Sequence, residues 1–485
     1  MEGSADTGSI ARGVLAVVTV LLATWASVHA VIYKRDPRAA LLWVGVAWLM
    51  PLLGPLLYSV LGVNRIRRWA ESLRRGMERY RSDAGTAVCT PDELERELPP
   101  EAAHLAGLAR AVDAAVDRPL LRGNRVVPLR DGDEAYPAMW ESIASAQRSV
   151  ALSSYIFDLD EVGERFARLL GDAGRRGVQV RVLVDAAGAR YSWPPIYGLL
   201  RREGVPQARF LPILPDWRLV TMNLRNHRKL LVVDGKVGFT GGMNLRLGHW
   251  RSRQPRRPVR DLHFQVEGPV VAHLQEAFVG DWQFTTGEAL RGDSWFPPLE
   301  AKGTVAARGV ADGPDEDYGK LRWTLLAALA AARTSIRIVT PYFLPDAALV
   351  AALNVAILRG VEVEILLPDR SNLPFVHEAS RAMWWQILER GCRLWLSPPP
   401  FDHSKLLLVD AAWAFVGSAN WDPRSLRLNF EFNLECYDPT MGEQLGAWIA
   451  ERQANAREVT LAEADGREFG QRLWDGTARL LTPFL

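Results

Sequence analysis

The most constraining feature of this chain is a polar string that occurs twice with the same internal spacing. The first copy comprises His227, Lys229 and Asp234, and the second comprises His403, Lys405 and Asp410. In each copy, six residues separate the Asp from a glycine-rich segment that ends in asparagine, at 241–244 and 417–420. Two copies with identical spacing indicate an internal duplication, and its polar residues favour one site to which both halves contribute.

The regions around the two strings also share an order of secondary structure. In each half a strand is followed by a helix and then, after Gly-Val, by a second strand; the predicted ranges are 149–157, 162–173 and 177–185 in the first half and 335–343, 347–358 and 360–367 in the second. This alternation indicates βαβ units with helices on the faces of a mainly parallel or mixed sheet. We therefore predict an α/β fold of two duplicated α/β/α domains, residues 116–300 and 301–485.

The first 64 residues have a different composition. Residues 13–33 and 39–64 contain no formally charged side chain. Each run is long enough to cross a hydrocarbon layer of ~30 Å, which takes about 20 helical residues. The second run follows at once, unlike the sequence after a cleaved signal peptide. We predict a two-helix transmembrane hairpin over residues 1–64, with a pair of buried soluble helices as the alternative.

Basic residues flank both apolar runs. Three lie between them (Lys34, Arg35 and Arg38), and more follow the second (Arg65, Arg67, Arg68, Arg74, Arg75, Arg79 and Arg81). By the positive-inside rule, this excess predicts a multi-pass protein of the inner (cytoplasmic) membrane whose N-terminus and main body are cytoplasmic. Residues 65–115 are charged and helix-prone, and we predict that they form a juxtamembrane helical linker.

Composition limits the functional classes. The net charge of +2 over 485 residues does not favour a dedicated nucleic-acid binder. Three distant cysteines form neither a disulfide framework nor a metal-ligand pattern, and the eight histidines show no His-x-x-x-His spacing. We therefore expect no metal and no cofactor.

Strand parity separates the roles within each string. Residues 227–233 are predicted as a strand, in which His227 and Lys229 share one face. Asp234 falls on the other face, at an Asp-Gly turn, so we expect it to support the structure. The second string has the same parity, with Ala411-Ala412 in place of the glycine turn. The catalytic motif would thus consist of His227, Lys229, Asp234, His403, Lys405 and Asp410, with the Asp residues in a supporting role.

Two Lys, two Asn and two His that converge would form a pocket for a phosphate anion. Lysine supplies compact positive charge, and glycine lets backbone N–H groups approach the anion. The expected phosphate-binding residues are Gly242, Asn244, Ser418 and Asn420. One imidazole can act as nucleophile and the other as general acid and then base. A nucleophilic imidazole needs its other nitrogen oriented, and Asp261 and Glu431 are the candidate carboxylates.

These residues resemble the signature of the phospholipase D superfamily, His-x-Lys-x4-Asp-x6-Gly-(Gly/Ser)-x-Asn. Further segments resemble bacterial cardiolipin synthases: 226–229, 239–244, 420–425, 428–431, the second apolar run with Trp43, Pro51, Gly54, Tyr58 and Gly62, and the tail 479–485. The resemblance covers nearly the whole chain. It departs from the family pattern at Asp402, where an apolar residue is commoner, and at 245–247, a change that bears on headgroup selection.

The resemblance implies phosphatidyl transfer through a phosphohistidine. One phosphatidylglycerol would donate its phosphatidyl group and release glycerol, and a second would accept it to give cardiolipin. By the same resemblance, His227 is the expected nucleophile and His403 the acid and base. The expected partners are phosphatidylglycerol and anionic membrane lipids, without nucleic acid. A basic run at 251–260 is either a headgroup-collecting loop or a solvated one.

Other functions stay open from sequence alone. Within the superfamily, a phospholipase would pass the phosphatidyl group to water and a phosphatidylserine synthase would pass it to serine. A nuclease fits poorly with the apolar N-terminal runs and the near-zero net charge. A non-catalytic membrane scaffold would not need intact His, Lys and Asn in both halves.

Overall fold

The structure is a computed structural model that describes residues 3–34, 36–62, 80–82, 85–211, 224–315 and 317–480. The chain divides into two compact units, Met1–Leu73 and Arg74–Leu485. The predictions on Arg35, on the arginines between 65 and 79 and on the tail beyond residue 480 lie outside the described residues.

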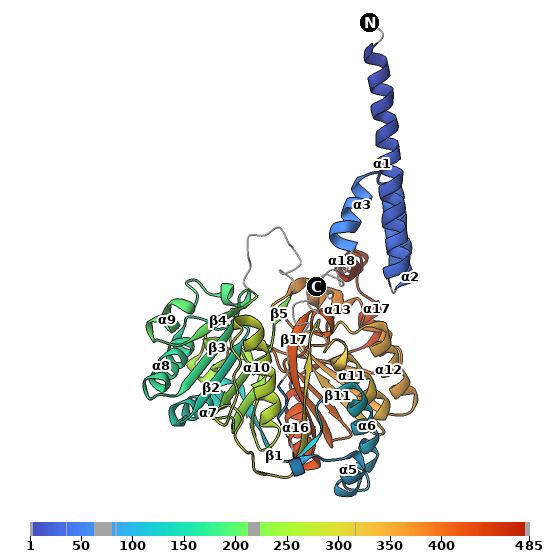
Figure 1. Ribbon diagram of the computed structural model, residues 1–485. Coiled ribbons are helices and arrows are strands. Elements are labelled where there is room, and N and C mark those ends of the chain that lie inside the picture. The colour runs from blue at the N-terminus through green and yellow to red at the C-terminus, as the bar shows by residue number, and fades with distance from the viewer. Residues whose placement is uncertain are drawn as a thin grey trace. The chain divides into compact units, whose positions relative to one another are not determined.

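The first unit is helical (Figure 1). Its helices are α1 (Gly3–Tyr33), α2 (Pro37–Leu49), α3 (Leu53–Leu57) and the π-helix η1 (Tyr58–Gly62). Within α1, Ser9–Tyr33 has a mean hydropathy of 2.1 and is long and apolar enough to cross a membrane. His29 of α1 lies inside this unit, with its Nδ1 2.7 Å from the hydroxyl oxygen of Tyr58. The prediction of a first span is therefore matched by one continuous apolar helix.

The second apolar run is not the continuous helix that we expected over 39–64. Helix α2 ends at Leu49, before Pro51, and Leu52 has a φ of 61°. Proline lacks an N–H group and disfavours helix in the residue before it, which explains the break. The chain then turns back on itself, since a Cβ added at Gly54 would lie 2.1 Å from the carbonyl oxygen of Val46. At 13 residues, α2 spans about 20 Å, less than the ~30 Å hydrocarbon layer.

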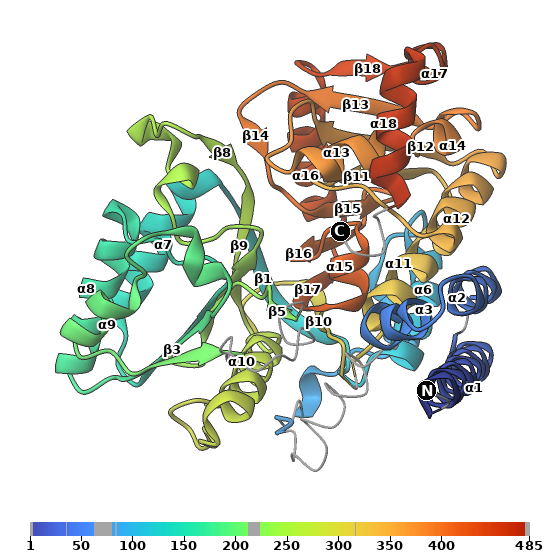
Figure 2. The same ribbon diagram turned by 90° about the horizontal axis from the view of Figure 1, so that it is seen from above.

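The second unit is built around one long mixed sheet. Its strand order is β18-β13-β12-β11-β15-β16-β17-β10-β1-β9-β7-β6-β2-β3-β4. Strand β10 (Val305–Asp312) pairs antiparallel with β1 (Leu121–Arg130) and with β17 (Asn429–Tyr437), so the two halves share a continuous sheet. Figure 2 shows the first half, in teal and green, beside the second half, in orange and red.

The two halves share a similar order of elements, and the second half has additional helices and a further strand near its end. The first half contains β1, α7 (Asp131–Ser145), β2 (Ser149–Ser154), α8 (Glu161–Arg175), β3 (Gln179–Asp185), α9 (Tyr197–Arg202), β4 (Gln207–Phe210), β5 (Arg225–Asn226), β6 (Leu230–Val233), β7 (Val237–Gly241), β8 (Val259–Arg260), β9 (Leu262–Glu267) and α10 (Val271–Thr286). The second half contains β10, α11 (Lys320–Ala331), β11 (Ser335–Val339), α12 (Ala347–Leu358), β12 (Glu362–Pro368), α13 (Pro374–Arg381), α14 (Trp385–Leu388), β13 (Arg393–Ser397), β14 (Phe401–Asp402), β15 (Leu406–Val409), β16 (Trp413–Gly417), α15 (Pro423–Arg427), β17, α16 (Pro439–Gln453), β18 (Arg457–Val459), α17 (Leu461–Asp465) and α18 (Phe469–Leu480).

The predicted strand–helix–strand unit of each half is confirmed. The strands β2 and β3 and the strands β11 and β12 pair in parallel. The helix between them buries an apolar face in each half, and α12 has the predicted bounds 347–358. Asp160 and Asp346 cap the two helices by accepting hydrogen bonds from backbone N–H groups of the first turn.

The segment that we predicted as a juxtamembrane linker contributes to a core where it is described. Helices α5 (Pro91–Glu97) and α6 (Ala106–Ala115) follow the short 3-10 helix Gly85–Ala87. Leu105 and Val112 are fully buried in one apolar cluster with residues of α11, α12 and β12. Residues 85–116 therefore pack as part of the second half.

Candidate active site

The two histidine strings meet where short parallel strands cross between the halves. Strand β5, directly before His227, pairs with the start of β17 of the second half. Strand β14, directly before His403, pairs with β8 of the first half. The His227 N–H donates to the Phe430 carbonyl at 2.9 Å, and the His403 N–H to the Arg260 carbonyl at 2.8 Å. Each histidine therefore lies beside the candidate carboxylate of the opposite half.

Glu431 contacts the ring of His227. The Nδ1 atom of His227 lies 3.0 Å from both carboxylate oxygens. Three further donors hold the same carboxylate: the Ser418 hydroxyl at 2.5 Å, the Ser425 hydroxyl at 2.8 Å and the Asn429 amide at 3.1 Å. A carboxylate that accepts from Nδ1–H leaves Nε2 of His227 unprotonated, with its lone pair available.

Asp261 contacts the ring of His403 in the same way. The Nδ1 atom of His403 lies 2.9 Å from Oδ2 of Asp261, and the Leu262 N–H donates to Oδ1 at 2.8 Å. The buried His249 lies further off, with its Nδ1 3.8 Å from Asp261. Asp261 thus has fewer donors than Glu431, although both carboxylates are fully buried.

The lysines of both strings are buried beside the histidines. The Nζ of Lys229 donates to the carbonyl of His227 at 2.6 Å, and the Nζ of Lys405 donates to the carbonyl of His403. An ammonium group has three donors, so each lysine keeps two for another acceptor. The expected strand over 227–233 begins only at Leu230, because His227 pairs with the opposite half instead of with β7.

The electrostatics of these groups show that the two strings converge. Burial lowers the pKa of His227 to about 4, against the attraction of Glu431. Burial, together with the charges of Lys405, Lys229 and His227, holds the pKa of His403 well below its usual value. Because Lys229 and His227 belong to the opposite half from His403, the two lysines and two histidines share one electrostatic environment.

The pKa values of the lysines and carboxylates in the site are also shifted by their surroundings. Burial lowers the pKa of Lys229 to about 7, partly offset by Glu431, and lowers that of Lys405 to about 8, partly offset by Asp261. Burial raises the pKa of Asp261 to about 6. Burial would also raise the pKa of Glu431, but its interactions with His227, Lys229 and Ser418 more than offset this effect and keep the pKa below its usual value. Glu431 is therefore the more firmly ionised of the two carboxylates.

The glycine-rich segments hold the carboxylates, which differs from the direct phosphate contact that we expected of Gly242 and Ser418. A Cβ at Gly242 would lie 2.1 Å from Oδ1 of Asp261, so only glycine leaves room for that carboxylate. The equivalent residue Ser418 donates its hydroxyl proton to Glu431. Each half therefore supports the carboxylate that orients the histidine of the other half.

The two asparagines have unequal partners. The Oδ1 atom of Asn244 accepts from the Ile156 N–H at 3.1 Å, which leaves the amide NH₂ as a donor. In Asn420, the backbone N–H donates to the Ser425 hydroxyl at 3.1 Å, and the buried Oδ1 has no hydrogen-bond partner among the described residues.

Asp234 and Asp410 bind backbone N–H groups and not the rings of His227 and His403. Asp234 accepts from the N–H groups of residues 147–149 at 2.7 to 3.1 Å, ahead of strand β2. Asp410 accepts from residues 333–335 ahead of β11, and the Nε2 of His104 lies 2.7 Å from its Oδ2. These contacts support the structural role that strand parity suggests.

Several supporting residues carried no separate signal in the sequence. Arg228 is 2% exposed, donates to the Glu431 carbonyl at 3.0 Å and pairs with Asp281 at 2.8 Å. The ring of Tyr155 lies 5.1 Å from that of His227. Only a residue next to a motif, such as Arg228, could have been suspected from position, because the fold brings the others in from distant segments.

Two arginines of the basic run 251–260 are already paired. Arg251 donates to Asp131 at 2.7 Å, and Arg253 pairs with Glu161. These pairs fit a structured loop better than one whose charges are all available to lipid headgroups.

Comparison with protein families matches most of the chain. Residues 139–282 and 325–452 match the family described as cardiolipin synthase, phospholipase D-like domain. Residues 21–62 match the family described as phospholipase D-nuclease N-terminal.

Curated relatives match over nearly the full length. The chain is 33% identical to cardiolipin synthase A of Pseudomonas fluorescens (strain SBW25), over 96% of each chain. It is 31% identical to the cardiolipin synthase of Geobacillus thermodenitrificans (strain NG80-2), over 93% of this chain and 90% of that one. Among solved structures, the phosphatidylserine synthase of Haemophilus influenzae Rd KW20 aligns with a TM-score of 0.60 at 14% identity, covering 78% of this chain and 100% of that chain. At that identity the likeness concerns the fold alone.

Proposed function

This chain belongs to the phospholipase D-like cardiolipin synthase family, and from that premise we propose that it transfers a phosphatidyl group between two phosphatidylglycerol molecules. The products are cardiolipin and glycerol. The observation that carries the proposal is the crossed pairing of each histidine with a carboxylate of the opposite half. This pairing orients two imidazoles from two halves for one reaction.

The first half-reaction forms a phosphohistidine. Nε2 of His227 attacks the phosphorus of phosphatidylglycerol, and the bond from phosphorus to the glycerol oxygen breaks. The imidazolium of His403 gives its Nε2 proton to the leaving oxygen, and glycerol departs. His403 is neutral in the empty site because its pKa is low, so binding of the phosphodiester anion must raise that pKa and let His403 take up the proton that it later donates.

The second half-reaction reverses these roles. A hydroxyl of a second phosphatidylglycerol gives its proton to His403 while its oxygen attacks phosphorus. The bond between phosphorus and Nε2 breaks, and His227 returns to its neutral form. In both steps Lys229, Lys405 and the amides of Asn244 and Asn420 stabilise the extra negative charge on the phosphorane.

His227 is the nucleophile in this proposal because of Glu431. The phosphohistidine carries a positive imidazolium ring that keeps its Nδ1 proton. Glu431 accepts a hydrogen bond from this N–H group and from three other donors, and it stays ionised. Burial, in contrast, raises the pKa of Asp261 to about 6. Glu431 is the more firmly ionised carboxylate, so it suits His227, which stays cationic throughout the life of the phosphohistidine. Asp261 suits His403, which carries a proton only briefly.

We propose that the N-terminal unit anchors the protein in a membrane. We propose that Ser9–Tyr33 crosses the bilayer and that the broken segment from α2 to η1 returns as the second arm of a hairpin. Residues 21–62, which include parts of both arms, match a single N-terminal family, and this match supports treating the two arms as one structural unit. The charge bias of the sequence favours a cytoplasmic main body at the inner membrane.

Product analysis tests the proposal. The purified full chain is incubated with vesicles of phosphatidylglycerol, and the lipids and the aqueous phase are analysed by mass spectrometry. Cardiolipin and glycerol in equal amounts are expected. Phosphatidic acid without cardiolipin would make the protein a hydrolase, and no lipid turnover would remove the proposal altogether.

A further inference from the structure

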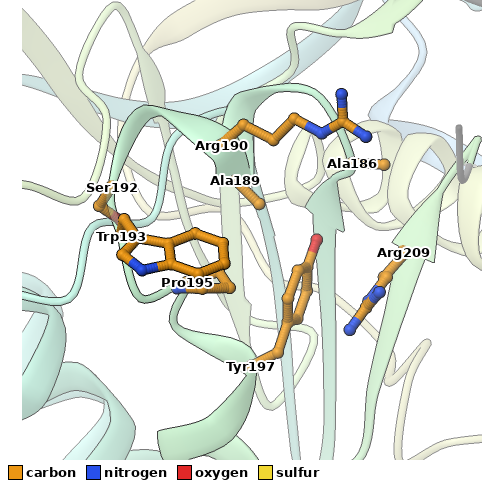
Figure 3. Close-up of a pocket in the computed structure, with 8 residues that line it drawn as sticks. All are labelled: Ala186, Ala189, Arg190, Ser192, Trp193, Pro195, Tyr197 and Arg209. Carbon is orange, nitrogen blue, oxygen red and sulfur yellow. The ribbon is translucent and has the colours of Figure 1, made fainter.

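A cavity of about 530 Å³ opens in the first half, apart from the histidines. Its walls are the chain that follows β3, from Ala186 to Tyr197, and Arg209 of β4. Figure 3 shows the indole of Trp193 on one side and two arginines on the other. The cavity is therefore apolar on one wall and cationic on the opposite one.

Side chains with hydrogen-bond donors line this cavity, among them Arg190, Tyr197 and Arg209. In Figure 3 the Tyr197 hydroxyl points toward the side where the guanidinium group of Arg190 lies, and the guanidinium group of Arg209 lies beside the Tyr197 ring. Tyr197 is 6% exposed, and its hydroxyl has no hydrogen-bond partner among the described residues. Arg209 lies over the Tyr197 ring at 4.2 Å, and neither arginine side chain forms an ion pair within the described ranges. Two arginines without an ion pair among the described residues and a buried hydroxyl form a suitable site for a phosphate oxygen.

The cavity adjoins the active site through Tyr155. A Cβ at Gly188 would lie 1.8 Å from the Tyr155 carbonyl oxygen, so the cavity wall packs directly against this residue. The ring of Tyr191 lies 6.1 Å from that of Tyr155, which in turn lies 5.1 Å from that of His227. A ligand in the cavity would therefore be a near neighbour of the reacting phosphate.

We propose that this cavity binds the phosphodiester of the acceptor phospholipid, and this inference rests on the proposed transfer reaction. The two lysines and two histidines compensate the phosphate being transferred. The acceptor carries a second negative phosphate that needs its own cations. Arg190 and Arg209 supply them, the Tyr197 hydroxyl donates to the same group, and the indole of Trp193, 93% exposed, contacts the apolar part of the lipid.

The test separates the two half-reactions. Labelled glycerol that attacks the phosphohistidine re-forms labelled phosphatidylglycerol, a reaction that uses the donor but no lipid acceptor. In the double variant Arg190→Ala/Arg209→Ala, we expect cardiolipin formation to fall at least about tenfold, since two charge-assisted contacts are lost. Glycerol exchange should stay within about twofold. Tyr197→Phe should raise the KM for the acceptor by about threefold or more and leave the rate of glycerol exchange unchanged.

A matched variant controls for net charge. Arg201→Ala/Arg202→Ala removes two exposed arginines of the neighbouring helix α9 and should leave both activities unchanged. Arg190→Lys/Arg209→Lys keeps the charge and should restore part of the cardiolipin formation. Equal losses of exchange and of cardiolipin formation would overturn the acceptor assignment, as would no loss in either.

A further arm distinguishes lipid from free phosphate. Millimolar inorganic phosphate should not alter cardiolipin formation by the wild-type protein. A change that disappears in Arg190→Ala/Arg209→Ala would mark a site for free phosphate and overturn the lipid assignment. If the wild-type protein forms no cardiolipin and exchanges no glycerol, the proposed transfer reaction itself fails, which is a different outcome.

Discussion

Nδ1 of His227 lies 3.0 Å from both carboxylate oxygens of Glu431, although the two residues stand 204 positions apart and belong to different halves. The pair of His403 and Asp261 repeats this crossing in the opposite direction at 2.9 Å. Neither half can orient its own histidine. The site therefore depends on the shared sheet and on the two short parallel pairings that dock the halves.

The first prediction concerns the two carboxylates. Glu431→Gln should lower kcat by about 10²–10⁴-fold, in the range known when an orienting carboxylate of a catalytic histidine becomes an amide. The amide keeps a hydrogen-bond acceptor but cannot neutralise the imidazolium of the phosphohistidine. Initial rates of cardiolipin formation, with circular dichroism to confirm folding, measure the effect.

Asp261→Asn is the matched control for this prediction. It should cost less than Glu431→Gln, because Asp261 supports a transient proton carrier. A folded Glu431→Gln protein with more than a tenth of wild-type activity would contradict the assigned role of Glu431.

The second prediction separates nucleophile from acid by changing the leaving group. A phosphatidyl ester of p-nitrophenol needs no protonation on departure. His403→Ala should therefore still release a burst of p-nitrophenol and retain labelled phosphatidyl on the peptide that carries His227. His227→Ala should give neither, and both variants should lose cardiolipin formation by several orders of magnitude. A label found on His403 would reverse the assignment.

Much of the fold was readable from the sequence because duplication and periodicity are local signals. The Gly-Val that begins each second strand and the apolar pattern of residues 347–358 placed the βαβ units in both halves. The spacing of the two strings also identified the two histidines and two lysines as site residues, and all four are buried in the structure.

The crossed pairing could not be read from the sequence. Asp261 and Glu431 each follow the string of their own half, and chain distance alone gives no reason to match either with the opposite histidine. The pairing is set by β5 and β14, strands of two residues, which are too short to leave a periodic signal. The sequence also does not reveal the break in the second apolar run, because the high hydropathy of residues 39–64 favours one continuous span and outweighs the local signal of Pro51.

The third prediction is that Asp234 supports stability more than chemistry. Asp234→Asn removes the negative charge that accepts from three backbone N–H groups ahead of β2. We expect the free energy of unfolding to fall by about 2 kcal/mol, as for hydrogen bonds to a charged group. Denaturant unfolding measures this loss, and kcat per folded molecule should stay above about a tenth of the wild-type value. A fully stable but inactive Asp234→Asn protein would refute the structural role.

The last prediction is a bell-shaped pH dependence of kcat/KM with limbs set by buried groups. Asp261 has a pKa of about 6, so it loses the charge that supports His403 as the pH falls below that value. Lys229 and Lys405 have pKa values of about 7 and about 8, so their positive charges are lost as the pH rises through this range. His227, with a pKa of about 4, stays unprotonated throughout and contributes neither limb. Activity should therefore be highest between about pH 6 and about pH 7 and decline on both sides. Lys229→Arg should move the basic limb to higher pH, because a guanidinium keeps its charge, while the larger group lowers the maximum. Initial rates in mixed micelles at constant ionic strength check this, and an unmoved basic limb in Lys229→Arg would assign that limb to another group.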